Sequence, residues 1–398
     1  MLLVLNAGSS SIKFALYELA DEGMPGAAIL GGELEALRGA ARMRVRPASQ
    51  AAPYERPLPA GAGHAEGLVE LFALLASEGI RPQAAAHRVV HGGSRYVQPV
   101  RVDAQVLAGL RELVPLAPLH QPHALAGMDA LAAAHPSLPQ VACFDTAFHH
   151  GLPALEAEFA LPAQVRALGV RRYGFHGLSC EHAMAELARV GGPLLAGSRT
   201  VIAHLGAGAS LAAVHEGRSR AVTMGFTALD GLTMARRCGA IDPGVVLYMQ
   251  QQLGMGAGDV AELLYQRSGL LGLSGESDDV RELLASTSPE AGFALEHFCY
   301  RAGRELGAMA AALGGLETLV FTGGIGEHQP PIRARIARHA AWLGVQLDER
   351  VNGGAGPASN GGAPALLSAP GSAVAVWCIA ADEMGVVARH AARLLRAA

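Results

Sequence analysis

The residue with the clearest chemical signature in this chain is Lys13. It is the only lysine among 31 basic residues, the other 30 being arginines. It follows a turn of small residues, NAGSSS at 6–11, that lies between two apolar runs. Backbone N–H groups and hydroxyls in such a turn, with an ammonium group beside them, form a suitable cradle for phosphate. Lysine and arginine are not interchangeable there. The turn predicts a phosphate-binding hairpin, with chance in an arginine-rich sequence as the alternative.

Two strands must position this turn, and the same arrangement recurs later in the chain. Residues 2–5 read as a buried strand, and Ile12, Phe14 and Leu16 alternate as a returning strand. The stretch TVIAHLGAGASLAAV at 200–214 repeats this order of apolar strand, small-residue turn and returning strand. Gly208 corresponds to Gly8, and Ser210 to Ser10. The repeat predicts an internal duplication with one phosphate hairpin in each half.

Two charged residues lie where a strand would be buried or would end. Arg88 is inside the strand-like run 84–90, an unfavourable place for a charge unless the strand borders a cleft. Asp145 follows the short strand 141–144, and open α/β sheets bind ligands at the carboxyl ends of strands. The alternative for Asp145 is a helix N-cap.

Three further features are weaker when taken alone. His176 lies between an aromatic residue and a glycine, where a histidine is usually packed or at the surface. Arg236 and Arg237 are adjacent in a loop or helix start and could equally form a solvated face. The run 323–327 (GGIGE) follows a buried strand, and we expect it to approach a ligand closely, with a helix only after Pro330. It matches neither GxGxxG nor GxxxxGK[ST].

The C-terminal segment reads as a strand at 373–381 followed by an amphipathic helix. Asp382 is placed to be the N-cap of this helix. Glu383 is placed to complement the helix dipole in the first turn. Local rules therefore assign both acids to the helix.

Composition limits the classes of partner and compartment. A chain of 398 residues exceeds one ordinary core, which favours two domains. The net charge of −4 gives no reason to expect nucleic acid or an anionic membrane as a partner. No apolar run reaches the ~18 residues of a membrane span, and no secretory signal is visible. Five scattered cysteines without a CxxC pair argue against disulfides or zinc. We expect a cytoplasmic protein.

Taken together, ten phrases in this chain resemble the acetate kinases. They occur in family order between residues 4 and 383, so the resemblance covers essentially the whole chain. The phrases are NAGSSSIKF, HRVVHGG, APLHQP, FDTAFH, RRYGFHG, AHLGAGAS, GLTMARRCGAIDP, SDDVREL, FTGGIGEH and ADE.

The resemblance implies an α/β fold of two duplicated actin-like (ribonuclease H-like) domains around a nucleotide cleft. Residues 1–150 with 382–398 would form the acyl-substrate and metal domain, and residues 151–381 the nucleotide-binding domain. The implied activity is the reversible reaction of ATP with acetate to give ADP and acetyl phosphate. It implies Mg²⁺, with Mn²⁺ as an alternative, and a cytoplasmic homodimer.

The resemblance also implies roles for individual residues. The implied catalytic residues are Asp145, His176 and Arg237; those that bind acetate are Arg88, Val90 and Leu119; those that hold the metal are Asn6 and Glu383. The residues implied to bind ATP are Lys13, His204, Leu205, Gly206, Ala207, Gly208, Asp279, Val280, Arg281, Gly324, Ile325, Gly326, Glu327 and His328.

Phosphoryl transfer asks for residues of these types. Charge spreads over the equatorial oxygens of the transferring group, so positioned cations and Mg²⁺ supply most of the catalysis. Arginine holds a carboxylate or phosphoryl group at two points, which suits Arg88 and Arg237. Asp145 is the catalytic acid in the family. Acetate is already ionised near neutral pH, so our hypothesis is that Asp145 orients Arg88 or a metal-bound water.

The chain departs from the family pattern at two informative positions. Ala207 stands where the second phosphate hairpin usually has asparagine, so one side-chain amide contact is missing. Ala228 replaces a proline in the wall of the acyl pocket. A smaller wall predicts tolerance of propionate, because one methylene gives only ~1–3 kcal/mol of discrimination. The alternatives are a kinase that prefers propionate or butyrate and, in another class, an ATP-gated chaperone or filament former.

Overall fold

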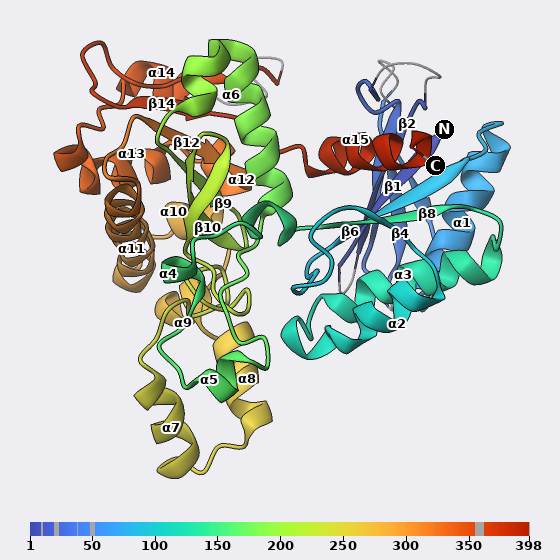
Figure 1. Ribbon diagram of the computed structural model, residues 1–398, viewed down its shortest axis with the longest axis horizontal. Helices are drawn as coiled ribbons and strands as arrows, with labels where there is room; N and C mark the ends of the chain where they lie inside the picture. Colours follow the sequence, from blue (N-terminus) through green and yellow to red (C-terminus); the bar gives the residue numbers. More distant parts are fainter. Residues whose placement is uncertain (9–10, 20–23, 38, 48–51, 355–361, 398) are drawn as a thin grey trace. The chain divides into compact units, whose positions relative to one another are not determined.

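The computed structural model describes residues 1–8, 11–19, 24–37, 39–47, 52–354 and 362–397 (Figure 1). The chain divides into two compact units. Unit 1 comprises Met1–Ala147 together with Asp382–Ala398, and unit 2 comprises Phe148–Ala381. Ser9 and Ser10, at the tip of the first predicted phosphate hairpin, lie outside the described residues.

Within the described residues, unit 1 contains an eight-stranded sheet in the order β5-β4-β3-β2-β1-β6-β8-β7. Its strands are β1 (Leu2–Ala7), β2 (Ile12–Tyr17), β3 (Leu30–Glu35), β4 (Arg42–Pro47), β5 (Tyr54–Pro57), β6 (Ala84–Val89), β7 (Val100–Arg101) and β8 (Gln140–Phe144). Its helices are α1 (His64–Ser77), α2 (Ala104–Glu112), the 3₁₀ turn η1 (Val114–Leu116), α3 (Gln121–Ala134) and α15 (Glu383–Arg396).

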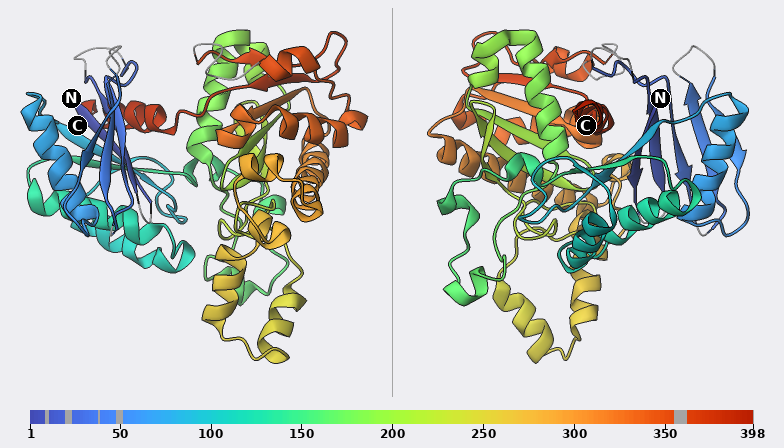
Figure 2. Two further views of the ribbon diagram at one scale, coloured as in Figure 1. Left: turned by 180° about the vertical axis from the view of Figure 1, so that it is seen from behind. Right: turned by 45° about the vertical axis from the view of Figure 1, so that its right-hand side comes forward.

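Alternation along β1 explains how this sheet is covered on both faces. Leu3 and Leu5 belong to the core that contains Leu68 and Leu71 of α1. Side chains of successive strand residues point to opposite faces, so the residues between them face the other side. There α15 packs over β1, β6 and β8, as Figures 1 and 2 show. The C-terminal helix therefore closes the N-terminal sheet and brings Glu383 to this unit.

Within the described residues, unit 2 contains a six-stranded sheet in the order β11-β10-β9-β12-β14-β13. Its strands are β9 (Thr200–Leu205), β10 (Ala209–His215), β11 (Arg218–Val222), β12 (Thr318–Thr322), β13 (Ala365–Leu366) and β14 (Ala375–Cys378). Its helices are α4 (Ala154–Ala157), α5 (Ala163–Arg166), α6 (Gly177–Gly197), α7 (Pro243–Gln251), α8 (Ala257–Gln266), α9 (Gly269–Ser274), α10 (Val280–Ala285), α11 (Pro289–Leu313), α12 (Gly323–His328), α13 (Pro330–His339) and α14 (Glu349–Gly354), with the 3₁₀ turns η2 (Ala147–His149) and η3 (Ala341–Leu343).

The two sheets share one topology. In unit 1 the order β3-β2-β1-β6-β8 combines antiparallel β1–β2 and β2–β3 pairs with parallel β1–β6 and β6–β8 pairs. In unit 2 the order β11-β10-β9-β12-β14 has the same directions. Helix α6 packs on β9 and β12, and α11 packs on β9, β10 and β11 (Figure 1). The predicted α/β class and duplication are confirmed.

Helix α12 begins earlier than the sequence predicted. The glycine run after β12 forms α12, so a helix begins directly at Gly323 and not only after Pro330. Gly323 has a φ of 78° and its backbone N–H donates to the Glu327 carboxylate at 3.0 Å, which closes the helical turn. Short glycine-rich helices have little local signal, because glycine disfavours helix interiors.

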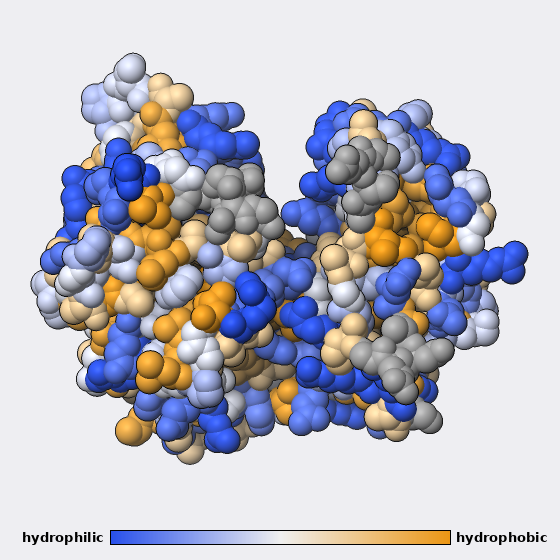
Figure 3. Space-filling model, turned by 90° about the horizontal axis from the view of Figure 1, so that it is seen from above, coloured by the Kyte–Doolittle hydropathy of each residue, from blue (hydrophilic) through white to orange (hydrophobic). Residues whose placement is uncertain are grey.

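Helices α7 and α8 form an arm that projects from the sheet of unit 2 in Figure 1. They share a small apolar core of Met249, Val260 and Leu264. Other apolar side chains of α7, such as Leu247 and Tyr248, are more than half exposed. Figure 3 shows the molecule from above, on the side away from the arm, and there hydrophilic and hydrophobic residues are interspersed. The α7–α8 arm therefore exposes several apolar side chains to solvent.

No helix in the described part of the chain has the length and apolar character needed to cross a membrane.

A buried histidine makes the stability of unit 2 depend on pH. His149 accepts a hydrogen bond from the Ser219 hydroxyl at Nδ1 (2.8 Å) and donates through Nε2 to the Phe175 carbonyl (3.0 Å). Burial lowers the pKa of His149 from 6.5 to about 4. Below pH 6.5 the unfolded chain binds a proton that the folded chain does not, so stability falls as the pH drops from 6.5 towards 4. From pH 7.5 to 5.5 we expect His149 to account for a loss of about 1 kcal/mol.

Urea unfolding at these two pH values checks this prediction. His149→Gln should remove about 1 kcal/mol of the pH dependence, whatever its effect on stability at pH 7.5. The matched control is His150→Gln, because His150 is the adjacent residue and is exposed. Equal pH dependence in His149→Gln and in the native chain would contradict the assignment.

Candidate functional site

Parallel strands β6 and β8 bring Arg88 and Asp145 together in unit 1. Arg88 pairs in register with Cys143, and Asp145 directly follows β8. The Arg88 Nε lies 3.1 Å from Asp145 Oδ1, and Nη2 lies 2.6 Å from Oδ2. The guanidinium thus holds the carboxylate at two points, which is the strongest geometry of this pair. Asp145 is only 1 % exposed, so the ion pair is shielded from solvent.

Two more predicted residues contact the same guanidinium. Asn6, on the neighbouring strand β1, accepts from Arg88 Nη1 at 3.4 Å through Oδ1. Glu383, the first residue of α15, places Oε2 3.3 Å from Arg88 Nε. Burial by itself lowers the pKa of Arg88, but the carboxylates of Asp145 and Glu383 outweigh it and raise the pKa. Arg88 is therefore a permanent cation surrounded by three oxygen-bearing side chains.

The first predicted phosphate hairpin adjoins this cluster. Lys13 on β2 is the direct cross-strand partner of Asn6, so both side chains lie on one face of the sheet. The turn is held by a bond from the Gly8 N–H to the Ser11 carbonyl (2.8 Å). His64, at the start of α1, lies 2.7 Å from the Gly8 carbonyl through Nε2. The sequence reasoning missed His64, because nothing local links α1 to the hairpin.

The structure places the two predicted acyl-pocket residues of unit 1 in different settings. Val90 is half-buried directly after β6, two residues beyond Arg88. Leu119 is exposed in the turn that precedes α3. Val90 therefore lies at the same strand end as Arg88. The structure gives no such link between Arg88 and Leu119.

The second predicted phosphate hairpin, between β9 and β10, lies against two predicted catalytic residues of unit 2. A methyl group at Gly208 would come within 2.6 Å of Arg237 Nη2 and 3.3 Å of His176 Nε2. A side chain at this position would have to move the Arg237 guanidinium, so glycine lets the guanidinium lie against the hairpin backbone. Arg237 donates through Nη1 to the Ala228 carbonyl at 2.6 Å. Burial lowers the pKa of the Arg237 guanidinium, which lies beside the glycine hairpin.

His176 and His204 lie side by side near this hairpin. Their ring centroids are 4.1 Å apart and the ring planes are inclined by 23°. Each Nδ1 is bonded to a serine hydroxyl, His176 to Ser210 at 2.9 Å and His204 to Ser179 at 2.8 Å. Ser179 was missed by the sequence reasoning, and Ser210 was noted only as the counterpart of Ser10. Neither carries a local signal, because its partner is a distant element.

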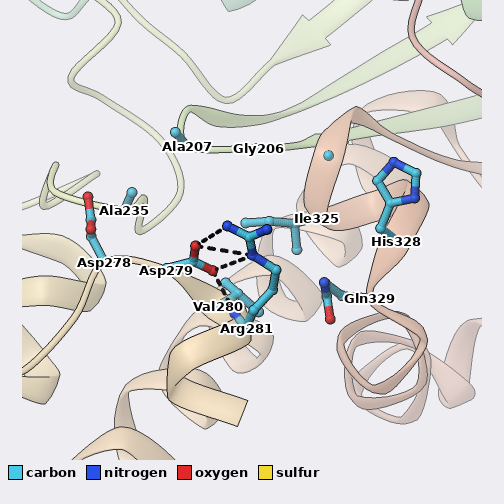
Figure 4. A pocket seen from close by; sticks show the side chains of 11 residues that line it. Gly206, Ala207, Ala235, Asp278, Asp279, Val280, Arg281, Ile325, His328 and Gln329 are labelled. Atoms are coloured by element: carbon cyan, nitrogen blue, oxygen red, sulfur yellow. Dashed lines mark hydrogen bonds and ion pairs between the residues drawn. The ribbon is translucent and has the colours of Figure 1, made fainter. Parts of the chain in front are cut away.

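Unit 2 also contains a pocket of about 480 Å³ (Figure 4). Eight of the predicted ATP-binding residues line it, together with three residues that were not predicted. The predicted ones are Gly206, Ala207, Asp279, Val280, Arg281, Gly324, Ile325 and His328, and the additional ones are Ala235, Asp278 and Gln329. The volume is that of ordinary small-molecule sites, and apolar walls with a few polar groups suit a planar base.

The charged residues at this pocket are mostly paired with one another. Arg281 binds the Asp279 carboxylate through Nε at 3.0 Å and 3.1 Å, as the dashed lines in Figure 4 show. The same pairing lowers the pKa of Asp279. Asp278 binds Arg236 at 2.6 Å. The rest of the pocket wall is largely alanine, glycine, valine and isoleucine.

Glu327 belongs to the predicted ATP set, but its side chain turns into the protein. Its Oε1 accepts hydrogen bonds from the backbone N–H groups of Gly323 (3.0 Å) and Ala381 (2.9 Å). It is 8 % exposed. This geometry favours a role in holding α12 in place.

The oxygen-bearing cluster around Arg88 also bears on metal binding. Among the residues that the structure describes, no group of three or more His, Cys, Asp or Glu side chains is arranged to hold a metal ion. Mg²⁺ does not need one, because it keeps several waters and is bound through one or two carboxylates plus substrate phosphates. The carboxylate of Glu383 and the amide oxygen of Asn6 are hard oxygen ligands on one cluster. This donor set fits Mg²⁺ or Mn²⁺ better than zinc.

Comparison with known proteins matches the whole chain to one family. The Acetokinase family pattern covers residues 1–389. The chain is 52 % identical to an acetate kinase of Rhodopseudomonas palustris over 99 % of this chain and 98 % of that protein. It is 44 % identical to an acetate kinase of Rhizobium meliloti, over 100 % of this chain and 98 % of the relative.

Two solved structures agree with this match over nearly their full length. The structure of a propionate kinase from Francisella tularensis has a TM-score of 0.89 and 32 % identity, covering 98 % of both chains. The structure of Porphyromonas gingivalis acetate kinase has a TM-score of 0.87 and 33 % identity, covering 99 % of both chains. The two-unit fold with its repeated hairpins agrees with these full-length matches, and the chain belongs to the acetokinase family.

Proposed function

We propose that this protein catalyses the reversible transfer of the γ-phosphoryl group of ATP to acetate, giving ADP and acetyl phosphate. The observation that carries the proposal is the family match over residues 1–389. The arrangement within each unit supports it. Unit 1 holds a charged arginine flanked by carboxylates, and unit 2 holds a base-sized pocket beside a glycine hairpin.

Unit 2 supplies the nucleotide side of the reaction. The base and ribose occupy the pocket walled by Ala235, Val280 and Ile325. The phosphates follow the hairpin between β9 and β10. The Gly206 N–H is bonded to the Gly208 carbonyl at 2.9 Å and fixes the turn, so the backbone N–H groups of Ala207 and Gly208 serve as the donors. Arg237 and His176 meet at Gly208 and bear on the transferring phosphoryl group. Positioned donors of this kind stabilise the charge of the transition state more than that of the ground state.

Unit 1 supplies the acyl side of the reaction. Arg88 binds the acetate carboxylate, and Val90 and Leu119 face its methyl group. One carboxylate oxygen forms a bond to the γ-phosphorus while the bond from that phosphorus to the β–γ bridging oxygen breaks. The electron pair leaves with ADP. No proton moves in this step, so Asp145 serves to hold Arg88 through the two bonds at 3.1 and 2.6 Å.

Mg²⁺ would be held by Asn6 and Glu383, with Mn²⁺ as an alternative, and would neutralise negative charge on the ATP phosphates. Lys13, across the strand pair from Asn6, adds a point charge to the same phosphates. Asn6, Lys13 and Glu383 therefore form the cationic and metal-binding part of the site in unit 1.

Trapping with hydroxylamine tests the reaction. Purified protein with ATP, Mg²⁺ and acetate should give one equivalent of acetohydroxamate per ADP formed. ATP hydrolysis without hydroxamate, particularly if peptides stimulate it, would instead favour a chaperone-like ATPase of the same fold. ADP formation that does not depend on acetate would contradict the proposal.

The second candidate is a kinase that accepts propionate well. The Francisella tularensis structure with a TM-score of 0.89 is a propionate kinase. In this chain Ala228 is small, and its carbonyl binds Arg237 at 2.6 Å, which places residue 228 next to the phosphoryl-binding arginine. We expect kcat/KM for propionate to lie within about 100-fold of that for acetate, because one methylene gives ~1–3 kcal/mol of discrimination.

A side-by-side kinetic series of acetate, propionate and butyrate checks this prediction. Ala228→Pro is the matched variant and should lower kcat/KM for propionate more than for acetate. Rejection of propionate by the native protein as strict as its rejection of butyrate would remove the role of Ala228.

Lys13→Arg is expected to lower kcat roughly 10- to 100-fold without loss of the fold. A point charge beside a phosphate is not replaced by a planar fork, and the side chain is exposed on β2, so folding tolerates the change. The matched control is Arg46→Lys, the reverse exchange at an exposed position of the same sheet. Native kinetics in Lys13→Arg would mean that a lysine stands at this position by chance and has no special role.

We also propose that the protein is a cytoplasmic homodimer. The exposed apolar side chains of Val245, Leu247, Tyr248 and Leu253 on the α7–α8 arm support self-association. None of the five cysteines is in a disulfide bond, as expected in a reducing compartment. Sedimentation as a 41.0 kDa monomer at micromolar concentration would contradict the dimer, and fractionation of cells tests the compartment.

A further inference from the structure

Four residues join the start of α6 to the β9–β10 hairpin in a reciprocal way. His176 is the N-cap residue of α6 and bonds to Ser210 on β10. Ser179, in the first turn of the same helix, bonds to His204 on β9. Each element thus contributes one histidine and one serine. We call these four residues the serine–histidine brace.

Sheet register makes this reciprocity possible. Ser210 and His204 are direct cross-strand partners in the antiparallel β9–β10 pair. On the helix side, residues three apart lie on the same surface, which places His176 and Ser179 together. The two imidazole rings then stack at 4.1 Å. His176 has a φ of 57°, an uncommon conformation for a residue with a side chain. The brace is among the contacts that hold it there.

The brace fixes which ring nitrogen faces the phosphate hairpin. A methyl group at Gly208 would lie 3.3 Å from Nε2 of His176. One at Gly206 would lie 3.8 Å from Nε2 of His204. Both Nδ1 atoms are bonded to serines, so both Nε2 atoms are on the side of the two hairpin glycines.

Burial determines the direction of the serine hydrogen bonds. Ser179 and Ser210 are each 1 % exposed. Among the described residues, the imidazole Nδ1 is the one hydrogen-bond partner of each hydroxyl oxygen. If Nδ1 carried the proton, the hydroxyl oxygen would accept a hydrogen bond from that N–H. The buried O–H of the serine would then have no acceptor, which costs roughly 1–3 kcal/mol of stability. A hydroxyl that donates to Nδ1 leaves the imidazole proton on Nε2, because a neutral ring has only one N–H.

We propose that Ser179 and Ser210 are positioning residues for phosphoryl transfer. By donating to Nδ1 of His204 and His176, they keep a proton on each Nε2, and these N–H groups point at the phosphate hairpin. Ser210 acts on His176, which bears on the transferring group, and Ser179 acts on its stacked neighbour. The effect on catalysis rests on the proposed function. The tautomers of the two histidines do not depend on that function.

The first measurement is nitrogen-15 NMR of the native protein labelled at histidine, recorded at pH 8 without substrates. His176→Asn and His204→Asn assign the two rings. We expect both rings to show an unprotonated Nδ1 and a protonated Nε2. Protonation of Nδ1 in His176 would overturn the proposal, and this outcome does not depend on whether the protein makes acetyl phosphate. Absence of hydroxamate with the expected tautomers would instead count against the proposed function alone.

The second measurement is steady-state kinetics of serine variants. Ser210→Ala should give His176 a mixture of tautomers and lower kcat about 10-fold or more, while KM for acetate changes less than about 3-fold. Ser179→Ala should do the same to the His204 tautomer with a smaller effect on kcat. Ser210→Thr keeps the hydroxyl in a strand and should restore both readouts.

The chain offers a matched control for these variants. Ser219 on β11 is 3 % exposed and makes the same bond to Nδ1 of His149, at 2.8 Å, but Nε2 of His149 bonds the Phe175 carbonyl and not the phosphate hairpin. Ser219→Ala should leave kcat near the native value although it removes an equivalent buried bond. Equal losses of kcat in Ser219→Ala and Ser210→Ala, or native tautomers and kcat in Ser210→Ala, would overturn the positioning role.

Discussion

Arg88→Gln is expected to lower kcat/KM for acetate at least about 100-fold and to destabilise unit 1 at the same time. The guanidinium holds the Asp145 carboxylate at two points, and that carboxylate is 1 % exposed. Removing one partner of a buried ion pair leaves an uncompensated charge, which costs about 3–5 kcal/mol. The same substitution removes the group that we propose to bind the acetate carboxylate. Steady-state kinetics and urea unfolding of the variant measure the two effects separately.

Two variants divide the roles at this ion pair. Arg88→Lys keeps the charge but cannot hold a carboxylate at two points, so it should recover stability more than acetate affinity. Asp145→Asn leaves Arg88 charged but loosely held, and we expect it to lower kcat. If Asp145→Asn instead kept near-normal turnover with a shifted pH profile, Asp145 would be acting in proton transfer. Native kcat/KM in Arg88→Gln would remove Arg88 from the acetate site.

Arg237→Gln is expected to lower kcat about 10³-fold or more with little change in stability. Arg237 Nη1 is bonded to a backbone carbonyl, and Nη2 lies beside Gly208 of the phosphate hairpin. A cation that meets the transferring phosphoryl group contributes 10³–10⁵ in kcat in comparable phosphoryl-transfer sites. Because this charge develops in the transition state, the KM values for ATP and acetate should change much less than kcat.

The adjacent residue provides the control for Arg237. Arg236 is exposed, and its partner is the Asp278 carboxylate at 2.6 Å. Arg236→Gln removes the same charge one residue away and should change kcat by less than about 3-fold. Similar losses in both variants would mean that general electrostatics, and not contact with the phosphoryl group, explains the effect.

The fold followed from the sequence where apolar periodicity and small-residue turns coincide. The alternation of Ile12, Phe14 and Leu16 and the repeat at 200–214 predicted two hairpins, and both sheets are built around them. The α12 helix was not expected, because its glycines disfavour a helix locally. It forms because the Glu327 carboxylate closes its first turn and holds Ala381 from a later strand end. That contact joins residues far apart in the chain, which local rules do not reach.

The part of the candidate site that could be predicted from the sequence is the part marked by a charged residue within a buried strand. Arg88 stood out in this way, and its contact with Asp145 follows from the parallel β6–β8 pair. Glu383 shows the limit of local reasoning. Its neighbour Asp382 caps α15 by accepting from the Gly385 N–H at 2.9 Å, as predicted, whereas Glu383 reaches Arg88 on a distant strand. Without the family resemblance, both acids would have been assigned to the helix.

Direct attack of an acetate oxygen on the γ-phosphorus is tested by phosphorus-31 NMR of the reaction with acetate labelled by oxygen-18 in its carboxylate. We expect acetyl phosphate and ADP in equal amounts, with oxygen-18 bonded to phosphorus in the acetyl phosphate. Inorganic phosphate and ADP without acetyl phosphate, or acetyl phosphate without oxygen-18 on phosphorus, would contradict direct attack.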